Sequence, residues 1–277
     1  MPDIKHFTFS SVSLQDFLDC ERRFELKHLL RQEWPAPQSE PILEVERRIR
    51  IGREFHFLIH QYLCGIALPE LQKMDLDPDI QHWLGRFETF FSEFPLVDFH
   101  SEYSVVTPFH DDYYLTAVYD LIGMTNQPKL LIMDWKTSPY PPVKKIISQT
   151  IQSMLYPFLA YENRTEIFKG DVINHADIEM IYWNAVHPGA RISMAYSMVQ
   201  HEKTREFLIK FIETIAGKSL GSFAKTENIK KCAYCQFRSL CERGSRAGLM
   251  DQDKGEIIDV DKLISELQFD DNAEIPF

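Results

Sequence analysis

Two aspartates and a lysine close two apolar runs, and together they could do metal-assisted chemistry. The four residues before Asp134 are all apolar and predict a short buried strand. Side chains alternate along a strand, so Asp134 and Lys136 should share a face that Trp135 does not. Asp120 ends a second apolar run, which predicts a neighbouring strand. Two carboxylates suit a magnesium ion and a lysine can hold charge on a phosphate, so the pattern predicts phosphodiester hydrolysis.

An isolated Asp-x-Lys pair is usually a structural ion pair, so the surrounding elements decide its meaning. Hydrophobic periodicity predicts an α/β order of three helices, three strands, a helix, two strands and a helix. Ser13 and Asp16 have the spacing of a capping box at the start of the first helix. The expected ranges are helices over 11–32, 44–63, 79–93, 144–162 and 201–216, and strands over 102–109, 113–124, 130–135, 177–184 and 191–199.

Four of the five cysteines have spacing that favours a metal centre. Cys232, Cys235 and Cys241 form a C-x2-C-x5-C pattern, and Cys20 is the expected distant fourth ligand. Disulfides are rare in cytosolic proteins, so metal binding is the better reading. The spacing alone does not choose between zinc and iron. Cys64 ends an apolar helical pattern, so we expect it in the core.

Composition places the chain among soluble globular proteins. It has 277 residues, of which 44% are hydrophobic and 26% charged. The segment 250–277 holds nine acidic residues and two lysines, so it carries −7 of the −11 net charge and leaves −4 for residues 1–249. Charge therefore neither supports nor excludes a nucleic-acid partner. With no signal-peptide pattern and no apolar run of membrane-spanning length, we expect a cytoplasmic protein that does not bind membranes.

Two motifs that would point to other enzymes fail on inspection. The sequence Ala216-Gly-Lys-Ser219 resembles the end of a phosphate-binding loop, but Ile212 stands where the first glycine is required. The pair His56 and His60 lacks the glutamate of a zinc-protease helix. An ATP-driven motor and a zinc protease are therefore not expected. A histidine on an apolar helix face is more often a core residue than a ligand, which remains our reading of His60.

Taken together, these residues resemble the RecB-like nucleases of the PD-(D/E)XK superfamily, in the branch with an iron–sulfur cluster. That branch includes CRISPR-associated RecB-like exonucleases and the AddB nuclease domain. The resemblance spans nearly the whole chain, from Cys20 to Cys241. Asp134 stands where many members have glutamate, which the motif allows. The matching elements are G-x3-H at Gly52–His56, a strand glutamate at Glu102, the aspartate Asp120, D/E-x-K at Asp134–Lys136, Q-x3-Y at Gln152–Tyr156, and the cysteine pattern.

The resemblance implies a role for each of these residues. His56, Asp120, Asp134 and the backbone carbonyl of Trp135 would bind Mg²⁺ or Mn²⁺. Lys136 would assist the attacking water. Gln152 and Tyr156 would position that water or the scissile phosphate. The four cysteines, Cys20, Cys232, Cys235 and Cys241, would hold a [4Fe–4S] cluster, with structural zinc as the alternative.

The implied fold is a restriction-endonuclease-like α/β core with a mixed central sheet flanked by helices. We expect one domain over 1–249, made of an N-terminal helical part (1–95), a nuclease core (96–216) and a cysteine segment (217–249), followed by an acidic tail (250–277). The expected activity is a DNase acting on DNA ends or single strands, with a helicase, CRISPR-adaptation or other DNA-processing partner. The alternative is a non-catalytic DNA-binding or assembly subunit that keeps the fold.

Overall fold

A computed structural model describes residues 4–34, 40–169 and 173–245, and it shows a mixed sheet between layers of helices. The acidic tail and most of the proline-rich link after residue 34 lie outside the described residues. The strands are β1 (Thr8–Phe9), β2 (Leu96–Phe109), β3 (Tyr113–Thr125), β4 (Leu130–Lys136), β5 (Ile178–Asn184) and β6 (Ile192–Ala195). The α-helices are α1 (Ser11–Asp19), α2 (Glu21–Phe24), α3 (Glu40–Leu63), α4 (Leu68–Leu71), α5 (Pro78–Phe91), α6 (Lys144–Ile147), α7 (Ile151–Glu162), α8 (Arg164–Ile167) and α9 (Met198–Ala216).

The sheet order is β1-β3-β4-β5-β6, and β2 pairs with the other edge of β3. The pairs β2–β3, β3–β4 and β5–β6 are antiparallel, whereas β1–β3 and β4–β5 are parallel. The parallel return from β4 to β5 passes through α6, α7 and α8, as a crossover connection requires. This is the mixed sheet flanked by helices that the sequence predicts.

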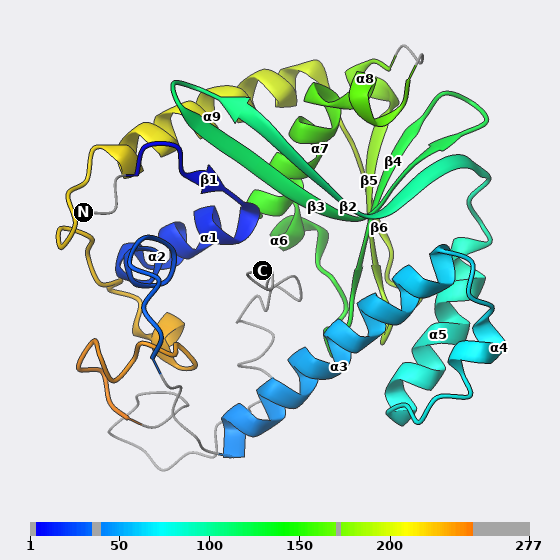
Figure 1. Cartoon of the computed structure of the whole chain (residues 1–277), viewed down its shortest axis with the longest axis horizontal. Helices are drawn as coiled ribbons and strands as arrows, with labels where there is room; N and C mark the ends of the chain where they lie inside the picture. Colours follow the sequence, from blue (N-terminus) through cyan, green and yellow to red (C-terminus); the bar gives the residue numbers. More distant parts are fainter. Residues whose placement is uncertain (1–3, 35–39, 170–172, 246–277) are drawn as a thin grey trace.

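Two hydrophobic cores cover the two faces of the sheet. The even-numbered residues of β4, Leu130 and Ile132, pack with α7 and α9, whereas Leu131, Met133 and Trp135 pack with α3 and α5. Figure 1 shows α7 and α9 on one side of the sheet and α3 and α5 on the other. Alternation along one strand thus places Asp134 on the α7 side and Trp135 on the α5 side, as expected.

The predicted helix over 11–32 is wrong, because the chain breaks at Cys20. Cys20 has an extended backbone (φ −164°, ψ 107°), which ends α1 and begins α2, and a π-helical turn then covers Glu25–Leu29. The capping box is also shifted: Ser10 caps α1 together with Ser13. Asp16 instead contacts Lys27 and His28. No proline or glycine marks this break, so it follows from packing.

The predicted helix over 144–162 is likewise divided, into α6 and α7. The break falls at residues 148–150, where Thr150 caps α7 by accepting a hydrogen bond from the Ser153 backbone N–H at 3.2 Å. Pro157 lies inside α7 without interrupting it. A local side-chain cap therefore decides the boundary, and the proline does not.

The remaining elements follow the predictions with shifted ends. Strand β2 begins at Leu96, six residues before the predicted start, and β6 is shorter than predicted. The short strand β1 was not predicted, since two residues carry no periodicity. Among the described residues, no helix is both long and apolar enough to span a membrane.

Candidate active site and cysteine centre

Asp120 lies where the sheet forks. The pairing of β3 with β4 runs from Met124–Leu130 to Leu121–Met133 and ends there, while β1 pairs with β3 only at Tyr114 and Leu115. In the gap, the Asp120 carboxylate accepts a hydrogen bond from the Trp135 backbone N–H at 3.0 Å. A buried carboxylate thus replaces a backbone partner at the point where the strands separate.

Glu102 faces the same gap from β2. The register of β2 with β3 passes from Ser101–Leu121 to Tyr103–Tyr119, and no ladder pair joins Glu102 to Asp120. The backbone of Glu102 has φ +50°, in the left-handed region that side chains other than glycine rarely adopt. Such strain inside a strand is characteristic of functional sites. The structure thus places Glu102, the strand glutamate matched by resemblance, beside Asp120.

Helix α3 brings a histidine to the two carboxylates. His56 Nδ1 lies 3.3 Å from Asp120 Oδ1. One ligand atom from each of His56, Glu102 and Asp120 lies within 4.8 Å of the other two, which makes them a candidate metal-binding set. Gly52, which opens the G-x3-H pattern, is buried one turn earlier on α3.

Asp134, at the end of β4, lies near Asp120 but outside this set of three. Its carboxylate accepts hydrogen bonds from Lys136 Nζ at 3.0 Å and from Gln152 Nε2 at 2.6 Å. The side chain of Asp134 is only 1% exposed. Lys136 and Asp134 do share one face, as the alternation predicts, and α7 supplies the glutamine. The sequence therefore brings an acid, a lysine and an amide together at one strand end.

The pKa values of Glu102 and Asp134 are raised by burial and by the neighbouring carboxylates. Burial, followed by the charge of Asp120, raises the pKa of Glu102 to about 7. Burial also raises the pKa of Asp134 to about 7, although Lys136 opposes this rise and Asp120 adds to it. Buried carboxylates that repel one another bind protons, and a divalent cation can take the place of those protons. The group thus has the electrostatics of a cation site.

The two other residues matched by resemblance lie at the margins of this group. Tyr156 is one helical turn from Gln152 on α7, and its ring packs against Tyr119, whose hydroxyl donates to the Tyr156 carbonyl at 3.0 Å. The indole of Trp135 is buried between Phe87 and His56 on the opposite face of the sheet. Only the backbone of Trp135 reaches the acidic group.

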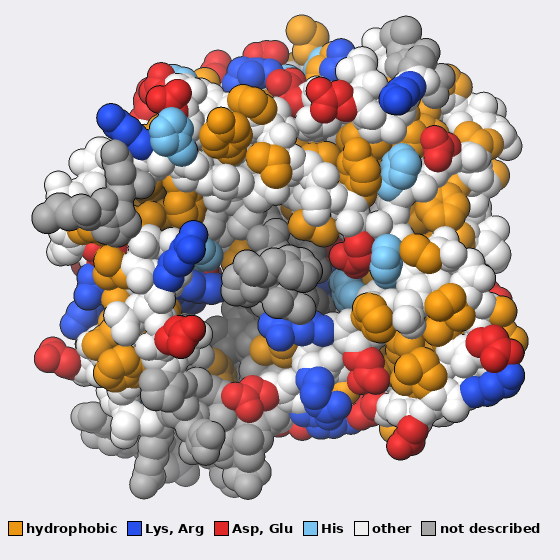
Figure 2. Space-filling view, viewed as in Figure 1, with side chains coloured by type: hydrophobic (Ala, Val, Ile, Leu, Met, Phe, Trp, Pro, Cys, Tyr) orange, Lys and Arg blue, Asp and Glu red, His pale blue; other side chains and the backbone are white. Residues whose placement is uncertain are grey.

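On the face seen in Figure 2, acidic and histidine side chains lie next to one another near the middle of the molecule, and lysine and arginine side chains lie below them. Arg50 and Arg53 on α3 are exposed and line an open pocket with Glu46 and Ile49. Arg53 lies one turn from His56. The clustered arginines of this helix were visible in the sequence, but their charge did not show which of them face the site.

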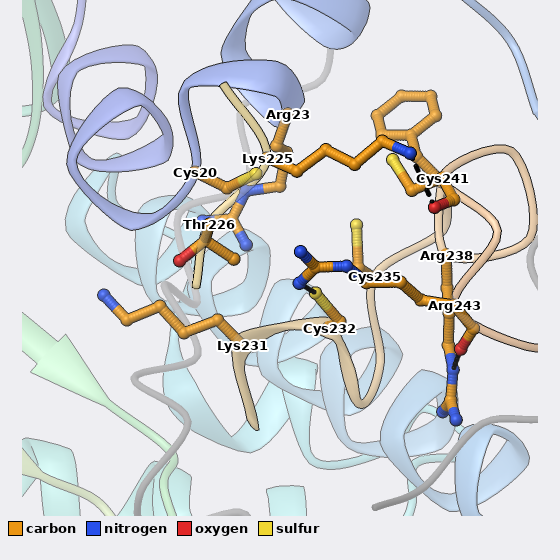
Figure 3. A pocket seen from close by; sticks show the side chains of 11 residues that line it. Cys20, Arg23, Lys225, Thr226, Lys231, Cys232, Cys235, Arg238, Cys241 and Arg243 are labelled. Carbon is orange, nitrogen blue, oxygen red and sulfur yellow. Dashed lines mark hydrogen bonds between the residues drawn. The ribbon is translucent and has the colours of Figure 1, made fainter. Parts of the chain in front are cut away.

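The four predicted cysteine ligands come together at a second site. Cys20, Cys232, Cys235 and Cys241 line one pocket, and Figure 3 shows their side chains arranged around it. Cys20 comes from the junction of α1 and α2, and the others come from the segment around the short 3-10 turn η3 (Ile229–Cys232). Burial raises the pKa of the Cys235 thiol to about 11, although nearby Arg23 opposes this rise.

Cationic side chains surround the thiols. Arg23, Lys225, Lys231 and Arg243 also line the pocket. Arg243 Nη1 donates to Cys232 Sγ at 3.2 Å, and Lys225 Nζ donates to the Cys241 carbonyl at 2.9 Å. Positive charge of this kind stabilises thiolates or an anionic metal–sulfur centre.

The remaining cysteine and histidine of the sequence prediction lie elsewhere. The expectation that Cys64 is a core residue is wrong, because its side chain is exposed at the end of α3. The apolar pattern of α3 ends one turn too early to cover it. His60 donates to or accepts from Ser101 Oγ at 2.7 Å and lies outside the metal-binding set, consistent with a structural role.

With this geometry established, comparison with known families is decisive. Residues 8–242 match the model of the PD-(D/E)XK nuclease superfamily. The chain belongs to this superfamily. The match includes every residue of the acidic group and all four cysteines of the second site. The expected α/β fold class of a PD-(D/E)XK nuclease is thereby confirmed.

Comparisons with individual proteins add little to the superfamily assignment. No curated protein matches the chain. Among solved structures, the protein SSO0001 is 15% identical with a TM-score of 0.38, covering 84% of this chain and 85% of its own. A protein from Eubacterium rectale described as a candidate exonuclease is 13% identical with a TM-score of 0.46, covering 81% and 86%. At these scores neither structure bears on the function.

Proposed function

We propose that this PD-(D/E)XK protein is a divalent-metal-dependent DNase that acts on DNA ends or single strands. The observation that carries the proposal is the convergence of His56, Glu102 and Asp120, with Asp134 beside them, in the sheet fork. A structural ion pair needs one acid and one base. Here two buried carboxylates, Asp120 and Asp134, lie beside the more exposed Glu102, at a cost that a bound cation would offset.

The donor set fits Mg²⁺ or Mn²⁺. Carboxylate oxygens are the ligands both ions prefer, and a histidine nitrogen suits Mn²⁺ especially. His56, Glu102 and Asp120 would hold the ion, and Asp134 and the Trp135 carbonyl would be further ligands. A cation held there would polarise a phosphoryl oxygen and lower the pKa of a bound water.

The residues around the acids have separate tasks in this proposal. Gln152 fixes the Asp134 carboxylate through its 2.6 Å hydrogen bond. Lys136, whose amine is 3.0 Å from the same carboxylate, would orient the attacking water or hold the negative charge that develops on the phosphate. Tyr156 would help to place the phosphate from one turn further along α7.

Two exposed arginines of α3 support a phosphate-bearing substrate. Arg47 and Arg48 on the same helix are ion-paired with Asp77 and Glu44. Arg50 and Arg53 form no ion pair with a carboxylate of the described residues. Exposed arginines on the helix that carries His56 favour contacts to phosphate groups.

The cysteine centre would be a [4Fe–4S] cluster of the RecB-like type rather than a zinc site. Among the described residues, His56, Glu102 and Asp120 are the only three whose ligand atoms lie within 4.8 Å of one another, so no three thiols are that close. Thiolates around one zinc, at about 2.3 Å each, would be roughly 4 Å apart. The wider spacing supports a larger cluster, which would join the two ends of the fold without entering the reaction.

Digestion of end-labelled single- and double-stranded DNA tests this function. Wild type should degrade DNA with Mg²⁺ or Mn²⁺ and stop in EDTA. Asp134→Asn should reduce the rate at least a hundredfold, whereas Asp75→Asn, an exposed acid elsewhere, should leave it unchanged. Metal-dependent DNA binding with no cleavage by wild type would favour the alternative of a non-catalytic DNA-binding or assembly subunit, for example with a helicase or CRISPR-adaptation partner.

A further inference from the structure

The short segment that contains α6 is held against the acidic group at its C-terminal end. The Ile147 carbonyl accepts hydrogen bonds from Ser153 Oγ at 2.6 Å and Thr150 Oγ1 at 2.9 Å. Ser153 Oγ also bonds the hydroxyl of Tyr182 at 2.9 Å. Tyr182 lies beside Asp134 in the paired strands β4 and β5. The end of α6 is therefore two hydrogen bonds away from Tyr182 of β5, the strand that pairs with β4 at Asp134.

The other end of the segment is fixed to β5. Asn184 Nδ2 donates to the carbonyls of Ser138 at 3.0 Å and Tyr140 at 3.2 Å. His187 Nε2 lies 2.6 Å from the Pro139 carbonyl. Two prolines, Pro141 and Pro142, follow and restrict the backbone. The residues from 143 to 146 thus form an exposed segment between two anchored ends. Figure 1 shows α6 near the N-terminal end of α7.

The surface of this segment carries two apolar side chains and two basic ones. Val143 is 52% exposed and Ile146 is 48% exposed. Lys144 and Lys145 are also exposed, and neither forms an ion pair with a described carboxylate. Val143 and Ile146 therefore flank the two lysines, and each leaves about half of its surface open to solvent.

We propose that the segment Val143–Ile146 binds the bases and phosphates of an unpaired DNA end and so selects single strands. The inference rests on the proposed nuclease function and names the form of its substrate. Only a single strand offers base faces for Val143 and Ile146, because in a duplex the bases are already stacked. Lys144 and Lys145, which lie between Val143 and Ile146 in the chain, bind the phosphates. A duplex end contacts only Lys144 and Lys145, because its bases are not available to Val143 and Ile146.

Binding measurements on a non-cleaving chain test this selection. Fluorescence anisotropy in the Asp134→Asn chain compares a labelled single strand with a blunt duplex of the same sequence. Adding Val143→Ser and Ile146→Ser should weaken single-strand binding about tenfold and leave duplex binding unchanged. Adding Lys144→Ala and Lys145→Ala should weaken both and reduce the salt dependence by about two ions.

Control variants remove the same kinds of side chain from other parts of the surface, so they test whether the position of Val143–Ile146 matters. Val97→Ser with Val106→Ser removes two equally exposed valines from β2, and Lys203→Ala with Lys210→Ala removes two exposed lysines from α9. Both pairs should leave binding unchanged. Circular dichroism and melting temperature verify the fold of each variant.

The possible results separate this inference from the proposed function. An unchanged single-strand affinity in the serine variant, or an equal loss for duplex, would overturn the role of α6. Absence of DNA cleavage by wild type would overturn the nuclease function alone. A selective loss of single-strand binding would support the inference in either case, because anisotropy does not require cleavage.

Discussion

Glu102 has a backbone conformation that favours glycine, although its side chain belongs to the candidate metal-binding set. The φ of +50° would suit glycine, yet the position carries a carboxylate directed at His56 and Asp120. A strained residue of this kind costs about 1–3 kcal/mol. The strain is understandable if the carboxylate is needed as a ligand.

Substitutions at Glu102 can separate strain from ligation. Glu102→Gly should relieve the strain and be more stable than Glu102→Gln by about 1 kcal/mol in EDTA. Both should lose most of the metal-dependent cleavage. Urea unfolding and the DNA digestion assay measure the two effects. If the glycine variant were the less stable of the two, the backbone of Glu102 would not be strained.

The raised pKa of Asp134 predicts a pH dependence of stability in the metal-free protein. A folded-state pKa of about 7, above the ordinary value, means that folding takes up a proton between those two values. The contribution to stability is therefore present below the ordinary pKa of an aspartate and is lost as the pH rises to 7. Mn²⁺ should reduce that loss, because it replaces the proton.

His175 and His201, whose pKa values are lowered by burial, change the stability in the opposite direction as the pH rises. Asp134→Asn keeps both histidines, so comparison with this variant isolates the effect of Asp134. In EDTA, raising the pH from about 5 to about 8 should destabilise wild type relative to Asp134→Asn by on the order of 2 kcal/mol. Urea midpoints at the two pH values measure the difference. Parallel changes in the two proteins would mean that Asp134 ionises normally.

At the scale of elements, hydrophobic periodicity predicted which segments form strands and helices, but capping and packing set their ends. Nothing in the sequence around Cys20 signals a helix break, because the break depends on contacts with residues of the distant cysteine segment. The Arg22 N–H, for example, donates to the Ala224 carbonyl at 2.9 Å. Such contacts between distant residues cannot be read from local periodicity.

The site residues were predictable for a related reason. Asp134 and Lys136 lie at the end of β4 and Asp120 lies inside β3, and the period of two along a strand fixes the direction of all three side chains. His56 and Glu102 were harder, because one lies on an apolar helix face and the other in an irregular strand position. In the local sequence, His56 looks like an ordinary core histidine and Glu102 looks like an ordinary exposed strand glutamate. For these two, resemblance to a family carried the prediction that periodicity could not.

Helix α3 is the element that we expect to bind substrate phosphates. Arg50→Ala with Arg53→Ala should weaken DNA binding and reduce the slope of log affinity against log salt by about two. Lys203→Ala with Lys210→Ala makes the same change of charge on α9 and should leave the slope unaltered. Anisotropy titrations over a range of salt give both slopes. Equal slopes for the two double variants would remove α3 from the interface.

At the scale of the whole molecule, the two ends of the described chain are joined beside the cysteines. Asp19 and Lys231, 212 residues apart, form an ion pair at 2.5 Å, and Trp34 Nε1 donates to Ser239 Oγ at 2.7 Å. Exposed or partly exposed polar contacts of this kind contribute little each. A cluster held by four cysteines would therefore supply most of the energy that closes this long loop.

Protein purified without oxygen should be brown, with about four irons per chain. Cys20→Ser should lose the colour and several kcal/mol of stability, roughly as for a long disulfide loop, and so should serine variants of Cys232, Cys235 or Cys241. Cys64→Ser, at an exposed thiol outside the pocket, should keep both. Iron analysis and thermal melting give the result. Stoichiometric zinc without iron would refute the iron–sulfur cluster, and a fully stable Cys20→Ser would refute the closure.

The central claim is that the carboxylates in the sheet fork hold a divalent cation and are more than a structural ion-pair network. Titration of the protein with Mn²⁺, followed by electron paramagnetic resonance of the free ion, measures this directly and without DNA. Wild type should bind Mn²⁺ at this site, and Asp120→Asn should weaken that binding at least tenfold while remaining folded. Asp75→Asn should bind as wild type does. Equal Mn²⁺ affinity in wild type and Asp120→Asn would contradict the account.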